Sequence, residues 1–208
     1  MAHAPRPRIE LWFEFASTYS YPAAMRVEQV AAEHGCEVAY RPFLLGPIFR
    51  AQGWDNSPFN IYPLKGRYMW RDLARICDEL ALPLVQPSQF PRNGLLPARV
   101  ACAAQDESFL PAFVRSVYTA NFVNDLEIAD PSVVMQCLEG LVPDPGAWLQ
   151  RAEAPEVKAR LRANSERAAA LGIFGSPSFV VGEELFWGND RLENALCWAT
   201  ANAARTAP

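Results

Sequence analysis

The chain has 208 residues, of which 50% are hydrophobic and 20% are charged, a composition typical of a folded globular protein with one or two domains. Its 19 lysines and arginines stand against 23 aspartates and glutamates, a net charge of −4, and no cationic stripe is present, which excludes a duplex nucleic-acid binder. No stretch approaches the roughly 18 uncharged apolar residues that span a bilayer.

Cysteine and histidine usage narrows the chemistry further. The five cysteines are far apart, and the first apolar run, residues 9–15, contains two glutamates and no signal-peptide cleavage site. We therefore expect reduced, mostly buried thiols in a cytoplasmic protein. The histidines are His3 and His34. A Ser-His-Asp relay would have to use His34, which lies beside Gly35 at a predicted helix end, and the sequence therefore argues against such a relay. Short metal-ligand spacing occurs only between His34 and Cys36, and no Gly-rich phosphate loop follows a strand.

The N-terminal part of the chain predicts a βαβ unit. Residues 9–15 are aromatic and alternate as in a strand, and residues 20–34 carry apolar side chains at helical spacing. Gly35 supplies the end of that helix, and residues 37–43 predict a second strand. We expect the two strands to be parallel, with a right-handed crossover between them.

The pattern then changes to helices and proline-rich connections, from about residue 44 to residue 171. Prolines that open helices, two of them directly after an aspartate at the N-cap position, mark three helix starts. Six helices are expected here, three over 65–82, 97–105 and 108–121 and three beginning at Pro131, Pro145 and Pro155.

Strand character returns near the C-terminus. Residues 178–181 and 185–187 flank a tight turn and predict a hairpin, and a last helix is expected over about 191–203. Asp190 and Glu193 have the spacing of a capping box at its start.

The order βαβ, helical segment, ββα predicts an α/β protein with the thioredoxin-like fold and a large helical insertion. Residues 1–44 and 172–208 would form the thioredoxin-like domain, and residues 45–171 the inserted helical domain.

Two segments, residues 13–21 (FEFASTYSY) and 172–179 (GIFGSPSF), resemble the DsbA-like group of thioredoxin-fold proteins. Within that group the chain resembles 2-hydroxychromene-2-carboxylate isomerases and kappa-class glutathione transferases, from about residue 9 to residue 199. Dithiol oxidoreductases of this fold carry Cys-x-x-Cys where this chain has Ser17 and Ser20. Thiol–disulfide exchange needs a thiolate, so it is excluded at this position.

The resemblance implies that Ser17 is the catalytic residue. Its hydroxyl would donate a hydrogen bond to the sulfur of bound glutathione and hold it as a thiolate, at a helix N-terminus that favours an anion. Such a bond contributes about 1.5–3 kcal/mol, which is about one to two pKa units. The alternative is that Ser17 caps the first helix, a role compatible with the first. The isomerases have proline after this serine, whereas this chain has Thr18.

Pro177 matches the cis proline that faces the active-site helix in thioredoxin-like folds, and an ordinary trans proline is the alternative. A cis bond there would present the backbone N–H and C=O of Ser176 to a peptide-like ligand in the manner of a strand.

Further glutathione-binding residues follow from the resemblance. Lys65 matches a lysine of kappa transferases, with Asn56 nine residues before it and Asp72 seven after it, and solvated surface charge is the alternative for Lys65 and Asp72. Asn189 and Asp190 resemble the Gly-x-Asp-Arg segment near the γ-glutamyl end of glutathione, and here the capping box is the alternative.

The resemblance therefore implies a homodimeric, glutathione-dependent isomerase that acts on a small aromatic-derived carboxylate. Its acceptor pocket would lie between the two domains and draw on aromatic residues such as Trp12, Phe49, Trp54 and Phe90, which as plain core residues are the alternative. A kappa-like transferase that leaves glutathione on an electrophile shares every site residue. A non-catalytic module that binds extended peptides at Pro177 is the third possibility.

Overall fold

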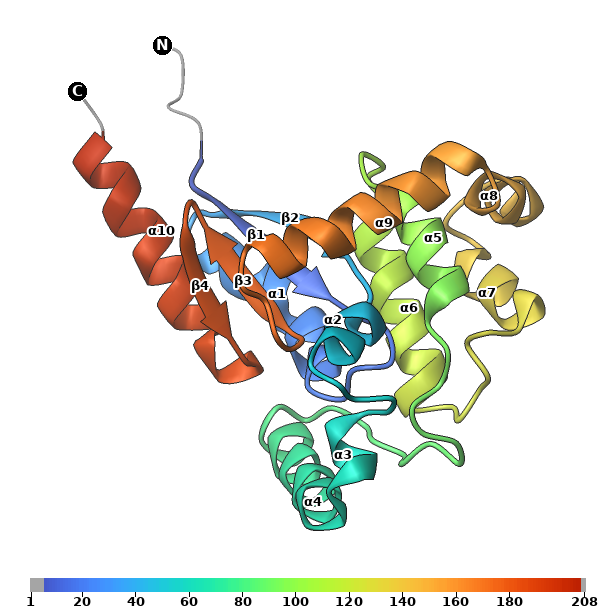
Figure 1. Cartoon of the computed structure of the whole chain (residues 1–208). Coiled ribbons are helices and arrows are strands. Elements are labelled where there is room, and N and C mark those ends of the chain that lie inside the picture. Colours follow the sequence, from blue (N-terminus) through green and yellow to red (C-terminus); the bar gives the residue numbers. More distant parts are fainter. Residues whose placement is uncertain (1–5, 207–208) are drawn as a thin grey trace.

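The computed structural model describes residues 6–206 (Figure 1). The chain begins with β1 (Arg8–Phe13), α1 (Ser20–Glu33) and β2 (Glu37–Pro42) and ends with β3 (Ser178–Val181), β4 (Glu184–Trp187), a 3₁₀ turn (Asn189–Arg191) and α10 (Leu192–Thr206). Between β2 and β3 lie α2 (Leu45–Ala51), α3 (Pro58–Ile61), α4 (Pro63–Glu79), α5 (Leu95–Ala103), α6 (Leu110–Phe122), α7 (Pro131–Leu138), α8 (Pro145–Ala152) and α9 (Pro155–Ala170). The predicted βαβ and ββα parts are confirmed.

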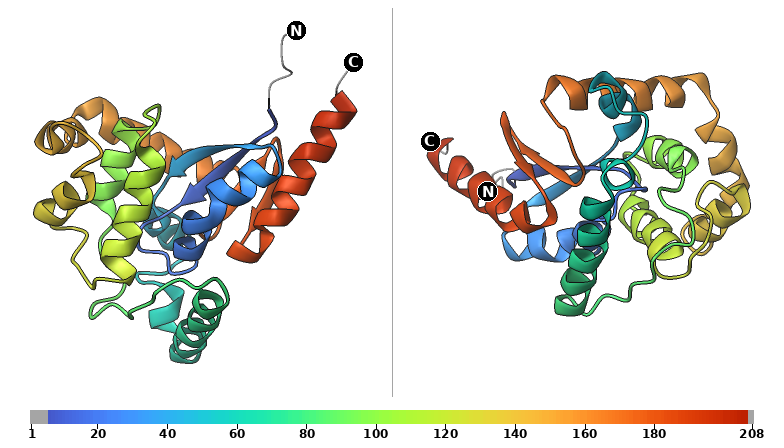
Figure 2. Two further views of the ribbon diagram at one scale, coloured as in Figure 1. Left: turned by 180° about the vertical axis from the view of Figure 1, so that it is seen from behind. Right: turned by 60° about the horizontal axis from the view of Figure 1, so that its bottom comes forward.

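The four strands form one mixed sheet in the order β2-β1-β3-β4. β1 and β2 are parallel, as predicted, with Leu11 opposite Tyr40, while β3 is antiparallel to both β1 and β4. Helices α1 and α10 cover one face, and α2 and α9 lie over the other (Figure 2). The sheet is therefore the middle layer of three.

Alternation along the strands divides the core between the two faces. Leu11 and Phe13 of β1 and Phe179 of β3 belong to the large cluster that also contains α1, α5, α6 and α10. The side chains one position along, Trp12 and Val180, join a smaller cluster with α2 and α9. Successive side chains of a strand point to opposite faces, so one short strand serves both layers.

A buried arginine ties the helical segment to the loop after β1. The Arg92 side chain precedes α5 and donates hydrogen bonds to Asn121 at the end of α6 and to Asp125 beyond it. Asn121 in turn donates to the backbone carbonyl of Phe15. These hydrogen bonds offset the cost of burying the charge, although the Nε of Arg92 has no hydrogen-bond partner among the described residues. They hold residues 92, 121 and 15 together.

Local helix signals were informative but incomplete. Asp130 accepts a hydrogen bond from the Ser132 N–H and Asp144 from the Ala147 N–H, which confirms both predicted caps. Helices α2 and α3 were not predicted. All elements between β2 and β3 in the described chain are helices, as predicted, while the division into two domains stays a prediction.

The capping box expected at Asp190 and Glu193 is wrong. The 3₁₀ turn has no side-chain cap hydrogen bond; Asp190 pairs with Arg191, and Glu193 pairs with Arg26 of α1. A guanidinium offers a carboxylate a charge-assisted bond, which is stronger than one from a neutral backbone N–H. The ion pair links α1 to α10 instead.

The cysteines are free thiols, four buried and one, Cys197, exposed. Within residues 6–206 no helix combines the length and apolarity that crossing a membrane requires.

Packing between α3 and α4 predicts a difference between two helical glycines. A Cβ on Gly66 would lie 2.3 Å from the carbonyl oxygen of Phe59, whereas one on Gly46 would meet only the Arg50 side chain, at 4.0 Å. We expect Gly66→Ala to lower the free energy of unfolding by about 1–3 kcal/mol. Gly46→Ala should raise it by up to about 1 kcal/mol, because alanine favours a helix. Urea denaturation of both variants measures the difference, and equal effects would contradict the packing.

Candidate active site

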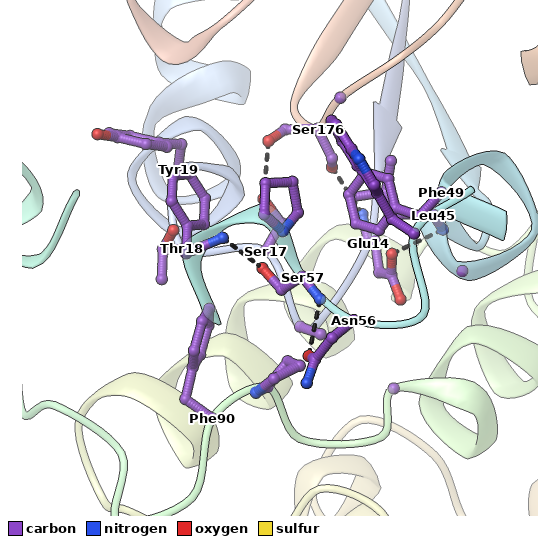
Figure 3. A pocket seen from close by; sticks show the side chains of 18 of the residues that line it. Glu14, Ser17, Thr18, Tyr19, Leu45, Phe49, Asn56, Ser57, Phe90 and Ser176 are labelled. Atoms are coloured by element: carbon purple, nitrogen blue, oxygen red, sulfur yellow. Dashed lines mark hydrogen bonds between the residues drawn. The ribbon is translucent and has the colours of Figure 1, made fainter. Parts of the chain in front are cut away.

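A cavity of about 470 Å³ opens where the sheet meets the helical segment (Figure 3). Its walls come from the loop after β1 (14–19), from α2 and the turn that follows it, and from the starts of α3 and α4. Residues 90–94, the loop before β3 (174–176) and Trp187 of β4 complete them. None of the described residues that line it is a cysteine. Within residues 6–206 no group of three histidines, cysteines or acidic residues is placed to hold a metal ion.

The predicted catalytic serine lies against the proline loop. The Ser17 hydroxyl donates a hydrogen bond of 2.7 Å to the carbonyl of Ser176, and the Ser176–Pro177 bond is cis, as predicted. The Ser176 hydroxyl accepts from the Glu14 N–H at 2.9 Å and lies 2.6 Å from the Ser20 hydroxyl. Three contacts thus join two loops about 160 residues apart in the sequence.

The local geometry separates Ser17 from the alternatives considered for it. Helix α1 begins at Ser20 with Tyr19 in the N-cap position and no side-chain cap hydrogen bond, so the capping role predicted as an alternative is wrong. The neighbouring Thr18 is 1% exposed, and its hydroxyl has no hydrogen-bond partner among the described residues. Both residues line the cavity, but Ser17 is half-buried whereas Thr18 is buried.

Two further predicted residues, Asn56 and Lys65, also line the cavity. The Asn56 side-chain oxygen accepts from the Ser57 N–H at 2.7 Å and from the Asn60 amide at 3.1 Å. The Lys65 ammonium lies 5.0 Å from the centre of the Tyr62 ring, a weakly attractive arrangement that leaves its charge available.

Asp72 follows Lys65 by seven residues, nearly two turns of α4, and is not among the residues that line the cavity. Its carboxylate accepts a hydrogen bond of 3.0 Å from the Tyr19 hydroxyl and lies 3.5 Å from the Tyr68 hydroxyl. Through its hydrogen bond with Tyr19, Asp72 therefore contacts the loop that also carries Ser17.

Asn189 and Asp190 also lie outside the cavity lining. The Asn189 side chain and carbonyl both accept from Arg26, at 3.0 and 2.7 Å, while Asp190 pairs with Arg191. They follow Gly188, whose N–H donates to the carbonyl of Pro177 at 3.0 Å. Their predicted role stays a prediction, at a position next to the proline loop.

Aromatic side chains form much of the wall. Phe49, Trp54 and Phe90 line the cavity as expected, but Trp12 is fully buried against Phe43 and does not. On a strand that carries apolar residues on both faces, sequence cannot tell which side chain reaches a cavity.

Phe174 and Trp187 were missed. Their rings lie 4.7 Å apart at the cavity rim, and a Cβ on Gly175 would lie 2.3 Å from the Trp187 indole nitrogen. The glycine in the proline loop is thus explained by the tryptophan packed on it, a contact between segments with no local sequence signal.

Sequence reasoning also missed Glu14. It follows β1, lines the cavity and accepts a hydrogen bond of 2.8 Å from the Leu45 N–H through Oε2. Burial raises the pKa of Glu14 from 4.5 to about 7, and the bond from Leu45 offsets this only in part. A carboxyl in an apolar wall next to Ser17 is the main unpredicted chemical feature of the site.

Comparisons with known proteins agree with the geometry. Residues 8–196 match the family model of the DSBA-like thioredoxin domain. A 2-hydroxychromene-2-carboxylate isomerase from Sphingobium xenophagum is 28% identical over 187 residues, 89% of this chain and 94% of that protein. Human glutathione S-transferase kappa 1 is 26% identical over 204 residues, 91% of this chain and 89% of that protein. The solved structure of a 2-hydroxychromene-2-carboxylate isomerase, 24% identical, superposes with a TM-score of 0.81 over 97% of this chain and 100% of its own, which confirms the predicted fold.

The raised pKa of Glu14 predicts a pH-dependent stability. Between pH 4.5 and about 7 the folded chain keeps a proton on Glu14 that the unfolded chain has lost, so this group lowers the free energy of unfolding as pH rises through that window. Replacing it by Glu14→Gln removes the effect while an amide oxygen can still accept from Leu45. Relative to the unsubstituted chain, the variant should gain about 1–3 kcal/mol between pH 5 and pH 8. Urea denaturation at the two pH values measures this, and a difference independent of pH would contradict it.

Proposed function

This chain belongs to the family of DsbA-like thioredoxin domains, and we propose that it is a glutathione-dependent isomerase of the 2-hydroxychromene-2-carboxylate type. The observation that carries the proposal is the contact between the Ser17 hydroxyl and the carbonyl of Ser176 at the wall of an aromatic-lined cavity. A hydroxyl stands where this fold uses a thiol, so the reactive sulfur has to come with a ligand. The relatives named as isomerases and kappa transferases support the same class of chemistry.

Glutathione supplies a nucleophilic thiolate when it is bound, and Ser17 is proposed to stabilise it. The hydroxyl gives up one neutral hydrogen bond, to Ser176, which is worth about 0.5–1.5 kcal/mol, and gains a bond to an anion, worth about 1.5–3 kcal/mol. The balance favours the thiolate. Helix α1 adds its N-terminal dipole behind the serine, and its first turn contains no acidic residue to oppose it.

The remaining site residues are proposed to bind the glutathione peptide. Ser176, beside Pro177, offers backbone groups for strand-like pairing. Lys65 and Asn56 provide a cation and an amide for a carboxylate, which fits their places in the cavity wall. The carboxylates at Asp72 and Asp190 and the amide of Asn189 are assigned to the polar ends of the tripeptide from the resemblance alone.

The substrate is proposed to be a small aromatic-derived carboxylate from the degradation of aromatic compounds. Rings such as Phe49, Trp54 and Phe90 offer flat apolar surface to an aromatic ring, and Arg50 and Lys65 add positive charge to the same cavity. From the resemblance we also propose that the protein is a cytoplasmic homodimer and that residues 45–171 form a helical domain inserted into the thioredoxin-like domain.

Two alternatives use the same residues differently. A kappa-like transferase would leave glutathione on an electrophile, and the human relative supports that class. A peptide-binding module without activity would use the Ser176–Pro177 loop alone.

Binding of glutathione separates an enzyme of this class from a peptide module. At a hundredfold excess over Kd, glutathione should stabilise the chain by about 2.7 kcal/mol, seen as a rise in Tm. Lys65→Gln should weaken the shift. The matched control is Lys158→Gln, because Lys158, the second lysine of the chain, lies on α9 in an exposed pair with Glu153. A Tm that glutathione does not change would favour the peptide module.

Turnover tests the reaction itself. We expect 2-hydroxychromene-2-carboxylate to isomerise only when glutathione is present, with glutathione recovered unchanged. Ser17→Ala should lower kcat/KM by about 10- to 100-fold, the loss of one bond to an anion. Thr18→Val, which removes the enclosed neighbouring hydroxyl, is the control and should stay within a few-fold. A Ser17→Ala variant with full activity would exclude the proposed role, and a glutathione-conjugated product would identify a transferase.

A further inference from the structure

The carboxyl of Glu14 is fixed in position by the backbone around it. The backbone N–H of Glu14 donates to the Ser176 hydroxyl, and its backbone carbonyl accepts from the Ser17 N–H at 3.0 Å and from the Tyr118 hydroxyl at 2.8 Å. The side-chain oxygen Oε2 accepts from the Leu45 N–H. The residue thus belongs to the same loop contact that positions Ser17. Figure 3 shows its side chain directed toward Leu45, away from Tyr19.

One carboxyl oxygen of Glu14 remains free. Oε1 has no hydrogen-bond partner among residues 6–206. Unlike the hydroxyl of Thr18, which also lacks a partner, Oε1 is not fully enclosed. Because Oε2 accepts from a backbone N–H, Oε1 is the oxygen that can carry a proton. The carboxyl is thus placed to offer an O–H to a molecule in the cavity.

No described cation neutralises Glu14. The charged or titratable groups of the surrounding elements are Arg50 on α2, Asp55 after it, Lys65 on α4, Arg92 before α5 and Tyr118 on α6. None of the ion pairs within residues 6–206 involves Glu14, whereas Arg92 is taken up by Asp125. An unpaired carboxylate next to aromatic rings is costly, and protonation removes that cost.

We propose that Glu14 is the acid–base residue of this cavity: its protonated Oε1 gives a hydrogen bond, and then a proton, to an anionic oxygen of an aromatic substrate. The proposal rests on the proposed function for the kind of substrate. It adds that the cavity takes up one proton when it binds an aromatic carboxylate or phenolate, because two negative charges in one apolar cavity repel each other.

The proton transfer suits the reactions proposed for this site. A conjugated carbonyl compound that a nucleophile attacks gathers negative charge on its oxygen. The Glu14 proton passes to that oxygen, and the carboxylate left behind keeps its bond from the Leu45 N–H. When the nucleophile leaves, the proton returns to Glu14, so the residue ends as it began. The raised pKa of Glu14, about 7, suits a group that both gives and takes a proton near neutral pH.

The test measures proton uptake without glutathione. Calorimetric titration of the full chain with trans-2-hydroxycinnamate, in buffers of different ionisation enthalpy, gives the number of protons bound with the ligand. We expect this number to rise from near zero at pH 5.5 to near one at pH 8, while Kd weakens about tenfold per pH unit above 7. Glu14→Gln should bind without proton uptake and with a Kd independent of pH. Asp55→Asn, which changes an exposed carboxyl at the same cavity, is the matched control and should behave as the unsubstituted chain.

Two results would overturn the proposal: proton uptake that persists in Glu14→Gln, or absence of binding at pH 6. If that variant does not fold, ¹³C NMR of glutamate-labelled protein replaces it, and a glutamate that titrates near neutral pH and becomes protonated on ligand binding is expected. Once turnover is established, Glu14→Gln should also lower kcat by about 100-fold or more, with part of the rate restored in Glu14→Asp. Because the binding arm omits glutathione, it can fail while the glutathione assays succeed, and the reverse.

Discussion

The contact between the loop after β1 and the proline loop before β3 is the constraint on which the site depends. Ser176 takes part in three hydrogen bonds at once, with Glu14, Ser17 and Ser20. The antiparallel pairing of β1 with β3 brings the end of β1 and the start of β3 to the same end of the sheet, and the hydrogen bonds then fix the distance between the two loops. Ser17 and Glu14 are both hydrogen-bonded to Ser176. A shift of either loop would therefore change the positions of both groups.

The helical segment extends this constraint to the opposite wall of the cavity. Arg92 and Asn121 link the approach to α5 and the end of α6 to the carbonyl of Phe15, two residues before Ser17. Breaking such a buried network leaves charged donors without partners, which is more costly than losing an exposed pair. The wall that carries Phe90 is therefore held at a fixed distance from the serine, although the two are far apart in sequence.

Whether a feature could be predicted from the sequence depends on how far apart in the chain the interacting residues are. Elements fixed locally were predicted, namely the helix of α1 and the aspartate caps of α7 and α8. The cis proline loop was predicted from the family resemblance. Glu14 was not predicted as a site residue, because its free oxygen and its aromatic surroundings arise only when α2 folds back over β1. Asp190 and Glu193 misled for the same reason, since Arg26 comes from a helix over 160 residues away.

The charges proposed for the cavity give a reason why a hydroxyl and a carboxyl would serve in one site. A negative charge held at Ser17 raises the free energy of a second one at Glu14, and the aromatic walls screen the two charges poorly. The proposed thiolate would therefore favour the protonated form of the carboxyl, because two acids that interact raise each other's pKa. In the proposed reaction each group would keep the other in its reactive form, because the anion would maintain the protonated acid and the neutral acid would limit the negative charge in the cavity. Arg50 and Lys65 line the same cavity, and their positive charges would attract the carboxylate of the proposed substrate.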